Sequence, residues 1–162
     1  MGADIAFWIL AVVIVGAALT VVVLRNLFRA ALALILCFAA VAGIYITLSA
    51  DFLAVIQILI YVGGISVLIL LAIMLTRDLP QGSPANRLRL PAFLTAAVLL
   101  GLMLFSVLNT AFPISKAAPL ENTTAAIGSK LLGEGGYLLP VEIAGVLLLA
   151  AIIGAIVLVR EK

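Results

Sequence analysis

Apolar residues fill five long stretches of this chain, and polar residues gather between them. Each stretch is close to the roughly 20 residues that an α-helix needs to cross a bilayer. Continuous apolar runs also exclude a membrane β-barrel, whose strands alternate apolar and polar residues. The pattern therefore predicts an all-α integral membrane protein, a single membrane domain over residues 1–162, with five transmembrane helices at 5–24, 30–48, 52–76, 90–109 and 138–159.

The connections between these stretches differ in length. Those at 25–29 and 49–51 are short, so the first three helices are expected to form a compact antiparallel set. The longest connection, 110–137, contains two prolines and four glycines. Loops of this length are usually functional or disordered. We expect this one to be a long outer loop that lies across neighbouring protein.

Composition supports a membrane protein without a redox centre of its own. The chain is 67% hydrophobic and 10% charged, whereas soluble domains carry about 25% charged residues. It has no histidine and one cysteine, Cys37, which leaves no ligand set for zinc, haem or an iron–sulfur cluster. We expect Cys37 to be a packing residue, the bilayer rather than a nucleic acid to be the chain's surroundings, and any redox chemistry to occur on other subunits.

The basic residues predict the orientation. Cytoplasmic loops of membrane proteins carry an excess of Lys and Arg. Seven of the nine basic residues fall on the side of the membrane that holds the C-terminus, so we expect an outside N-terminus and a cytoplasmic C-terminus. The first stretch lacks the basic residues that precede a signal peptide core and is expected to remain as a helix. The seven are Arg25, Arg29, Arg77, Arg87, Arg89, Arg160 and Lys162.

The third stretch carries the most unusual pattern. Gln57 and Tyr61 are one helical turn apart and are followed by the pair Gly63–Gly64. In an α-helix Gln57, Tyr61 and Gly64 share one face, and Ser66 lies away from it. One hypothesis is a polar stripe towards a water-filled path between subunits, with the glycine pair hosting a π-bulge. The alternative is ordinary packing, in which the glycines admit a close neighbour and Gln57 bonds to a nearby carbonyl.

Two carboxylates stand at predicted helix starts. Glu142 follows Pro140, and a carboxylate in a first helical turn is favoured by the helix dipole. The alternative for Glu142 is a protonatable group at the edge of a proton path. Asp51 directly precedes the third predicted helix and is expected to be its N-cap rather than a proton carrier.

Four groups of residues resemble the J-type subunit of respiratory complex I, which is membrane subunit six of the mitochondrial enzyme. The third-helix motif is the most specific of them, and Gly64 stands where the family usually has alanine. The matching segments are Asn26 with Ala30–Leu32, Gly43–Tyr45 with Ala50–Phe52, Gln57–Gly63 with Val67–Leu75, and Leu139–Glu142 with Leu147–Ala150.

The resemblance implies a five-helix subunit of a proton-translocating NADH:quinone oxidoreductase, in a bacterial cell membrane or a thylakoid membrane, with no catalytic centre or cofactor on this chain. NAD, FMN, iron–sulfur clusters and quinone would belong to partner subunits. The chain would lie among the quinone-site subunit, the small K-type subunit and the antiporter-like subunits. Its third helix would switch between π-bulged and regular forms near Tyr61, which opens and closes a hydrated proton path.

Two other readings stay open at this point. One is a homologous subunit of a membrane-bound hydrogenase or a cation/proton antiporter complex. The other is a non-catalytic assembly scaffold, in which the third helix would serve packing alone.

Overall fold

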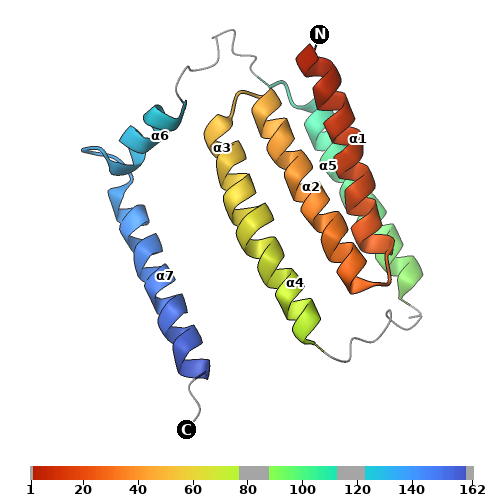
Figure 1. The fold of residues 1–162 in the computed structure, drawn as a ribbon. Helices are drawn as coiled ribbons and strands as arrows, with labels where there is room; N and C mark the ends of the chain where they lie inside the picture. Colours follow the sequence, from red (N-terminus) through yellow and green to blue (C-terminus); the bar gives the residue numbers. More distant parts are fainter. Residues whose placement is uncertain (1, 77–87, 113–122, 160–162) are drawn as a thin grey trace.

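The computed structural model describes residues 2–76, 88–112 and 123–159, and every element in these ranges is a helix (Figure 1). Five helical spans are long and apolar enough to cross a membrane, as the apolar pattern predicts. The third span is continuous from Asp51 to Leu75 but consists of α3, a π-helix η1, and α4. The elements are α1 (Gly2–Val23), α2 (Leu27–Thr47), α3 (Asp51–Ile56), η1 (Gln57–Ile65), α4 (Ser66–Leu75), α5 (Arg89–Asn109), α6 (Thr123–Leu132) and α7 (Leu138–Val159).

Helix α2 is the centre of the packed part of the chain. It lies between α1 on one side and the third span on the other (Figure 1), which confirms the expected compact set of three helices. The contacts use small residues, because the buried apolar positions of the described chain are all alanines. At Gly43 the approach of α1 is so close that an added methyl group would lie 2.9 Å from Leu10 Cδ1. Small residues allow this packing where apolar burial gives helices no advantage over lipid.

Helix α2 begins earlier than the hydropathy pattern predicts. The Oδ1 atom of Asn26 accepts a hydrogen bond from the backbone N–H of Arg29 at 3.1 Å, so Asn26 is the N-cap. An N-cap oxygen satisfies a first-turn donor that has no partner within the helix. The helix therefore starts at Leu27 rather than at residue 30, and Arg29 lies in its first turn instead of in the connection.

The turn from α2 to α3 is closed by backbone hydrogen bonds. Ala50 N–H donates to Tyr45 O at 2.8 Å and Ser49 N–H donates to Ile46 O at 3.0 Å, the pattern of a Schellman motif. Ser49 has a φ of 57°, in the left-handed region that this motif requires. The carbonyl groups at the end of α2 are thereby satisfied, and the chain can reverse within three residues.

The predicted N-cap of the third span is wrong by one residue. Ala50 occupies the N-cap position, with non-helical dihedral angles and no side-chain cap, and its carbonyl accepts from Ala54 N–H at 3.0 Å. Asp51 is instead the first residue of α3 and is exposed. A carboxylate there is still favoured by the helix dipole, but it does not cap the helix.

The expected long loop at 110–137 contains a helix, α6, which packs against α3 and α7. Alanine, leucine and lysine favour this helix. The glycines of the segment disfavour a helix, so the composition as a whole predicts a loop. The helix ends in a glycine turn, where Gly133 N–H donates to Ser129 O at 2.8 Å and Gly135 has a φ of 74°. Left-handed glycine after a helix is a common way to end it.

Helices α5 and α7 are nearly unpacked within this chain. Among the described residues α5 contacts no other helix, α7 contacts only α6, and neither span buries a residue. In a bilayer such apolar surfaces are free to contact lipid or the helices of other subunits. Most of the helix packing of the described residues is therefore found in the unit formed by α1, α2 and the third span.

Candidate functional site

The π-helix η1 is the irregularity expected at the glycine pair, and it is longer than a single bulge. It runs over nine residues, from Gln57 to Ile65. Its hydrogen-bond register is still visible at its end, where the backbone N–H of Ser66 donates to the carbonyl of Tyr61, five residues earlier. π-helical segments are rare and frequently occur at functional sites.

Gln57 is buried against α2. Its side chain is 7% exposed, and Nε2 donates to the carbonyl of Phe38 at 3.4 Å. This is the bond to a nearby carbonyl that the packing interpretation expects. The distance is at the long end of the range for a hydrogen bond, so the contact satisfies the amide only weakly.

Tyr61 lies beside the same α2 residue but remains accessible. Its ring meets the ring of Phe38 edge to face, with centroids 5.4 Å apart and an interplanar angle of 74°. Tyr61 is 41% exposed, and within the part of the chain that the structure describes its hydroxyl forms no hydrogen bond. Phe38 thus holds Gln57 through its carbonyl and Tyr61 through its ring, and the phenol is open to another subunit or to water.

The face predicted for an α-helix is not the face that the structure buries. Gly64 is exposed, whereas Ser66 is only 2% exposed. Gln57 and Ser66 are nine positions apart, which in an α-helix is about two and a half turns and would put them on opposite faces. A π-turn holds more residues, so the same nine positions complete fewer turns and both side chains are buried. The expected Gln57–Tyr61–Gly64 face is therefore replaced, and Ser66 takes the place of Gly64.

Ser66 is a site residue that the sequence reasoning set aside. Its hydroxyl donates to the Tyr61 carbonyl at 2.7 Å, so that one carbonyl accepts both the N–H and the O–H of Ser66. The sequence held one signal for it. A serine five residues after Tyr61, inside an otherwise apolar half-helix, is placed to bond to that carbonyl only if the helix is π-helical.

Glu142 is not brought together with η1. It lies on α7, which contacts only α6 among the described helices, and it is exposed. The helix-start interpretation is also wrong, because α7 begins at Leu138 and has no acidic residue in its first turn. The backbone is already in the helical ladder just before Glu142, since Val141 N–H bonds to Tyr137 O at 3.3 Å.

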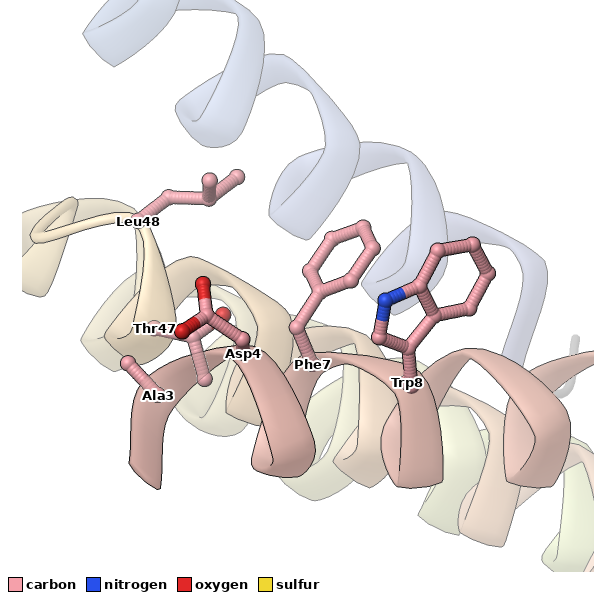
Figure 2. A pocket seen from close by; sticks show the side chains of 6 residues that line it. All are labelled: Ala3, Asp4, Phe7, Trp8, Thr47 and Leu48. Carbon is pink, nitrogen blue, oxygen red and sulfur yellow. The ribbon is translucent and has the colours of Figure 1, made fainter. Parts of the chain in front are cut away.

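A separate pocket lies where α1 begins and α2 ends (Figure 2). It has a volume of about 210 Å³, and Figure 2 shows the Asp4 carboxylate beside Thr47 and the rings of Phe7 and Trp8 along one side. The two rings meet edge to face at 5.8 Å. Aromatic residues at helix ends are typical of membrane interfaces. The lining residues are Ala3, Asp4, Phe7, Trp8, Thr47 and Leu48, none of which was predicted as a site.

Comparison with known proteins identifies the family. Residues 17–158 match the family described as NADH-ubiquinone/plastoquinone oxidoreductase chain 6, and the chain belongs to this family. The NAD(P)H-quinone oxidoreductase chain 6 of Synechocystis sp. is 44% identical over 161 residues, covering 97% of this chain and 80% of the relative. That of Leptolyngbya boryana is 41% identical, covering 98% and 80%.

A relative with a different name is similar over as much of the chain. The F(420)H(2) dehydrogenase subunit J of Methanosarcina mazei is 39% identical, covering 96% of this chain and 90% of the relative. Chloroplast proteins are also among the relatives. Together with the five apolar helices, they identify a multi-pass protein of a bacterial inner membrane or a thylakoid membrane.

The contact between Tyr61 and Phe38 predicts different roles for the ring and the hydroxyl of Tyr61. Tyr61→Leu removes the ring pair and should destabilise the packing of η1 on α2 by about 0.5–1.5 kcal/mol beyond the lost area. Tyr61→Phe keeps the ring and should leave stability unchanged. The measurement is the thermal midpoint of the purified complex that contains each variant. Equal midpoints for the two variants would show that the ring contact does not stabilise the third span.

Proposed function

We propose that this chain is the coupling subunit of a proton-translocating NAD(P)H:quinone oxidoreductase. The relatives named as chain 6 of NAD(P)H-quinone oxidoreductases support the type of complex. The observation that carries the coupling role is the π-helix in the middle of the third span, with one polar residue buried against α2 and a phenol left accessible. An ordinary membrane anchor has no need for this arrangement.

The proposed mechanism is a change of register in η1. A return to regular α-helix rotates the two ends of the third span relative to each other, because an α-turn holds fewer residues than a π-turn. Tyr61 and Gln57 then change their position against Phe38. We propose that this movement opens and closes a hydrated path beside Tyr61, Gly63 and Gly64, through which protons pass when a partner subunit reduces quinone.

Electron carriers and neighbours belong to the rest of the complex in this proposal. NAD, FMN, iron–sulfur clusters and quinone are held by partner subunits, and this chain has no catalytic centre. The open faces of α5 and α7 suit contacts with the quinone-site subunit, the small K-type subunit and the antiporter-like subunits.

A second candidate differs in the electron donor. The relative from Methanosarcina mazei is named as a subunit of an F(420)H(2) dehydrogenase, so a chain of this family serves a complex with another donor there. Hydrogenase and antiporter complexes remain related alternatives, and an assembly scaffold is the alternative without coupling. The neighbouring genes, or the subunits that copurify with this chain, distinguish the donors. The variants described next distinguish the scaffold.

Gly63 provides the test of the register change. A Cβ atom at Gly63 would lie 3.4 Å from Ile58 O across the π-turn, the closest contact at either glycine of the pair. Alanine also favours regular helix over glycine enough for about a fivefold shift in population. We expect Gly63→Ala to slow proton-coupled quinone reduction more than it lowers assembly, and Gly63→Val to be worse.

The measurement is proton pumping and quinone reductase activity in membranes, normalised to assembled complex. Gly101→Ala in α5 is the matched control, because nothing lies within 4 Å of a methyl group there. If both Gly63 variants keep normal rates, the third span is a packing element only and the coupling role is refuted.

A separate prediction concerns Glu142. A carboxylate in a transmembrane helix needs a partner in the assembled complex, and we propose that Glu142 lies at the edge of the proton path. Glu142→Gln keeps the shape and removes the charge. We expect a modest loss of pumping, well below the loss of about 100-fold or more expected for an obligatory proton carrier. A complete loss in an intact complex would assign Glu142 to the path itself.

Another prediction concerns the orientation of the chain in the membrane. Figure 1 shows the start of α1 and α6 at one end of the helices and the end of α7 at the other. Arg25 and Arg29 lie where α1 ends and α2 begins, at the same end of the helices as the end of α7. We propose that this end is cytoplasmic, because cytoplasmic segments carry an excess of basic residues. In a Cys37→Ala background, Gln81→Cys should react with an impermeant maleimide only from the cytoplasmic side, and Glu134→Cys only from outside. Labelling from the opposite sides would invert the topology.

A further inference from the structure

The helical register of the third span decides which of two small residues, Ser66 or Gly64, lies on the same face as Gln57. In the structure the residues of the third span that are buried are Ala54, Gln57 and Ser66. Gly64, two positions before Ser66, is exposed. If the span were a regular α-helix from Gln57 onward, Gly64 would follow Gln57 by about two full turns and would share its face, and Ser66 would not. The π-helix therefore exchanges one small residue for the other.

The exchange matters because the position is too tight for a larger side chain. The buried residues of α2 are alanines. Ser66 is 2% exposed, and outside its own span the only described helix that contacts α4 is α2. Its neighbours Ile65 and Val67 are 37% and 49% exposed. A helix packed this closely accepts a small residue and is destabilised by added bulk.

We propose that Ser66 and Gly64 are alternate positioning residues for Tyr61, which occupy the same packing position against α2 in the two registers of the third span. Ser66 fills the position in the π-helical register, where its hydroxyl bonds to the Tyr61 carbonyl at 2.7 Å. Gly64 fills it in the regular register. The proposal rests on the register change proposed above and adds the residues that make both registers packable.

The Ser66 hydroxyl fits this role because its acceptor is a backbone carbonyl of the same helix. A serine in a helix bonds to a carbonyl of the preceding turn, so its polar group stays satisfied in whichever register the helix adopts. Glycine has no side chain to satisfy. Whichever of the two residues faces α2, no side-chain polar group is left without a hydrogen bond.

Two bulky variants should push the helix in opposite directions. Gly64→Leu places its side chain on the exposed face of the π-register and blocks the regular one, so this complex should be held π-helical. Ser66→Leu blocks the π-register, so its helix should be regular. Each should lower proton-coupled quinone reduction by at least about fivefold, the effect of overpacking a close contact. Ser66→Ala keeps the small volume and should retain both registers.

The readout is the helical register in electron cryo-microscopy maps of each intact complex, at rest and during turnover with NADH and quinone, beside the normalised rates. A Gly64→Leu complex that reaches the regular register as often as the wild type overturns the proposal, even if Ser66→Leu fails to assemble. If the wild-type register never changes and Gly63→Val pumps normally, the proposed function itself fails. If the register changes and Gly63→Val slows pumping while both leucine variants behave as wild type, only the roles of Ser66 and Gly64 are refuted.

Discussion

The carbonyl group of Tyr61 sets the geometry of the third span. It accepts the backbone N–H of Ser66 and the Ser66 hydroxyl, at 2.7 Å for the latter, instead of serving only a residue four positions on. These bonds lie at the end of η1, whose π-helical turns over Gln57–Ile65 hold more residues than α-turns and so rotate the part of the helix that follows. The burial of Ser66 and the exposure of Gly64 are consequences of that rotation. In a bilayer this carbonyl must have a partner in one register or the other, because a backbone group without a partner costs several kcal/mol and no water is present to replace it.

Helix α2 is the surface on which this irregular helix packs. Its alanines let both neighbours approach closely, and its own start and end are fixed by the Asn26 cap and the turn at Ser49. Phe38 of α2 contacts two polar side chains of η1, through its carbonyl to Gln57 and through its ring to Tyr61. A register change in η1 must therefore alter both contacts at once, which links the buried amide to the accessible phenol.

Hydropathy alone predicted the five spans, because bilayer thickness imposes a length and a composition that the sequence displays directly. It located the boundaries less well where local bonding decides them, as with the Asn26 cap, the Ala50 cap and helix α6 in the expected loop. For the site, Gln57, Tyr61 and the glycine pair were found as a polar and flexible group. Ser66 was missed because its position was computed with α-helical periodicity across a segment that is π-helical. Periodicity cannot assign faces beyond an irregularity whose length is unknown.

The energetics of η1 suit a helix that changes form. Exchanging bonds between residues five apart for bonds between residues four apart leaves few backbone groups unpaired, so the cost is confined to the ends of the segment. Side-chain bonds add little resistance, since the Gln57 contact is long at 3.4 Å and the Ser66 bond is local to the helix. The remaining barrier is packing against α2, where bulk would favour one register and small residues tolerate both. The two forms stay close in free energy only if each register places a small residue against α2. Events at a distant quinone site can bias the helix towards one form only when the two forms are close in free energy.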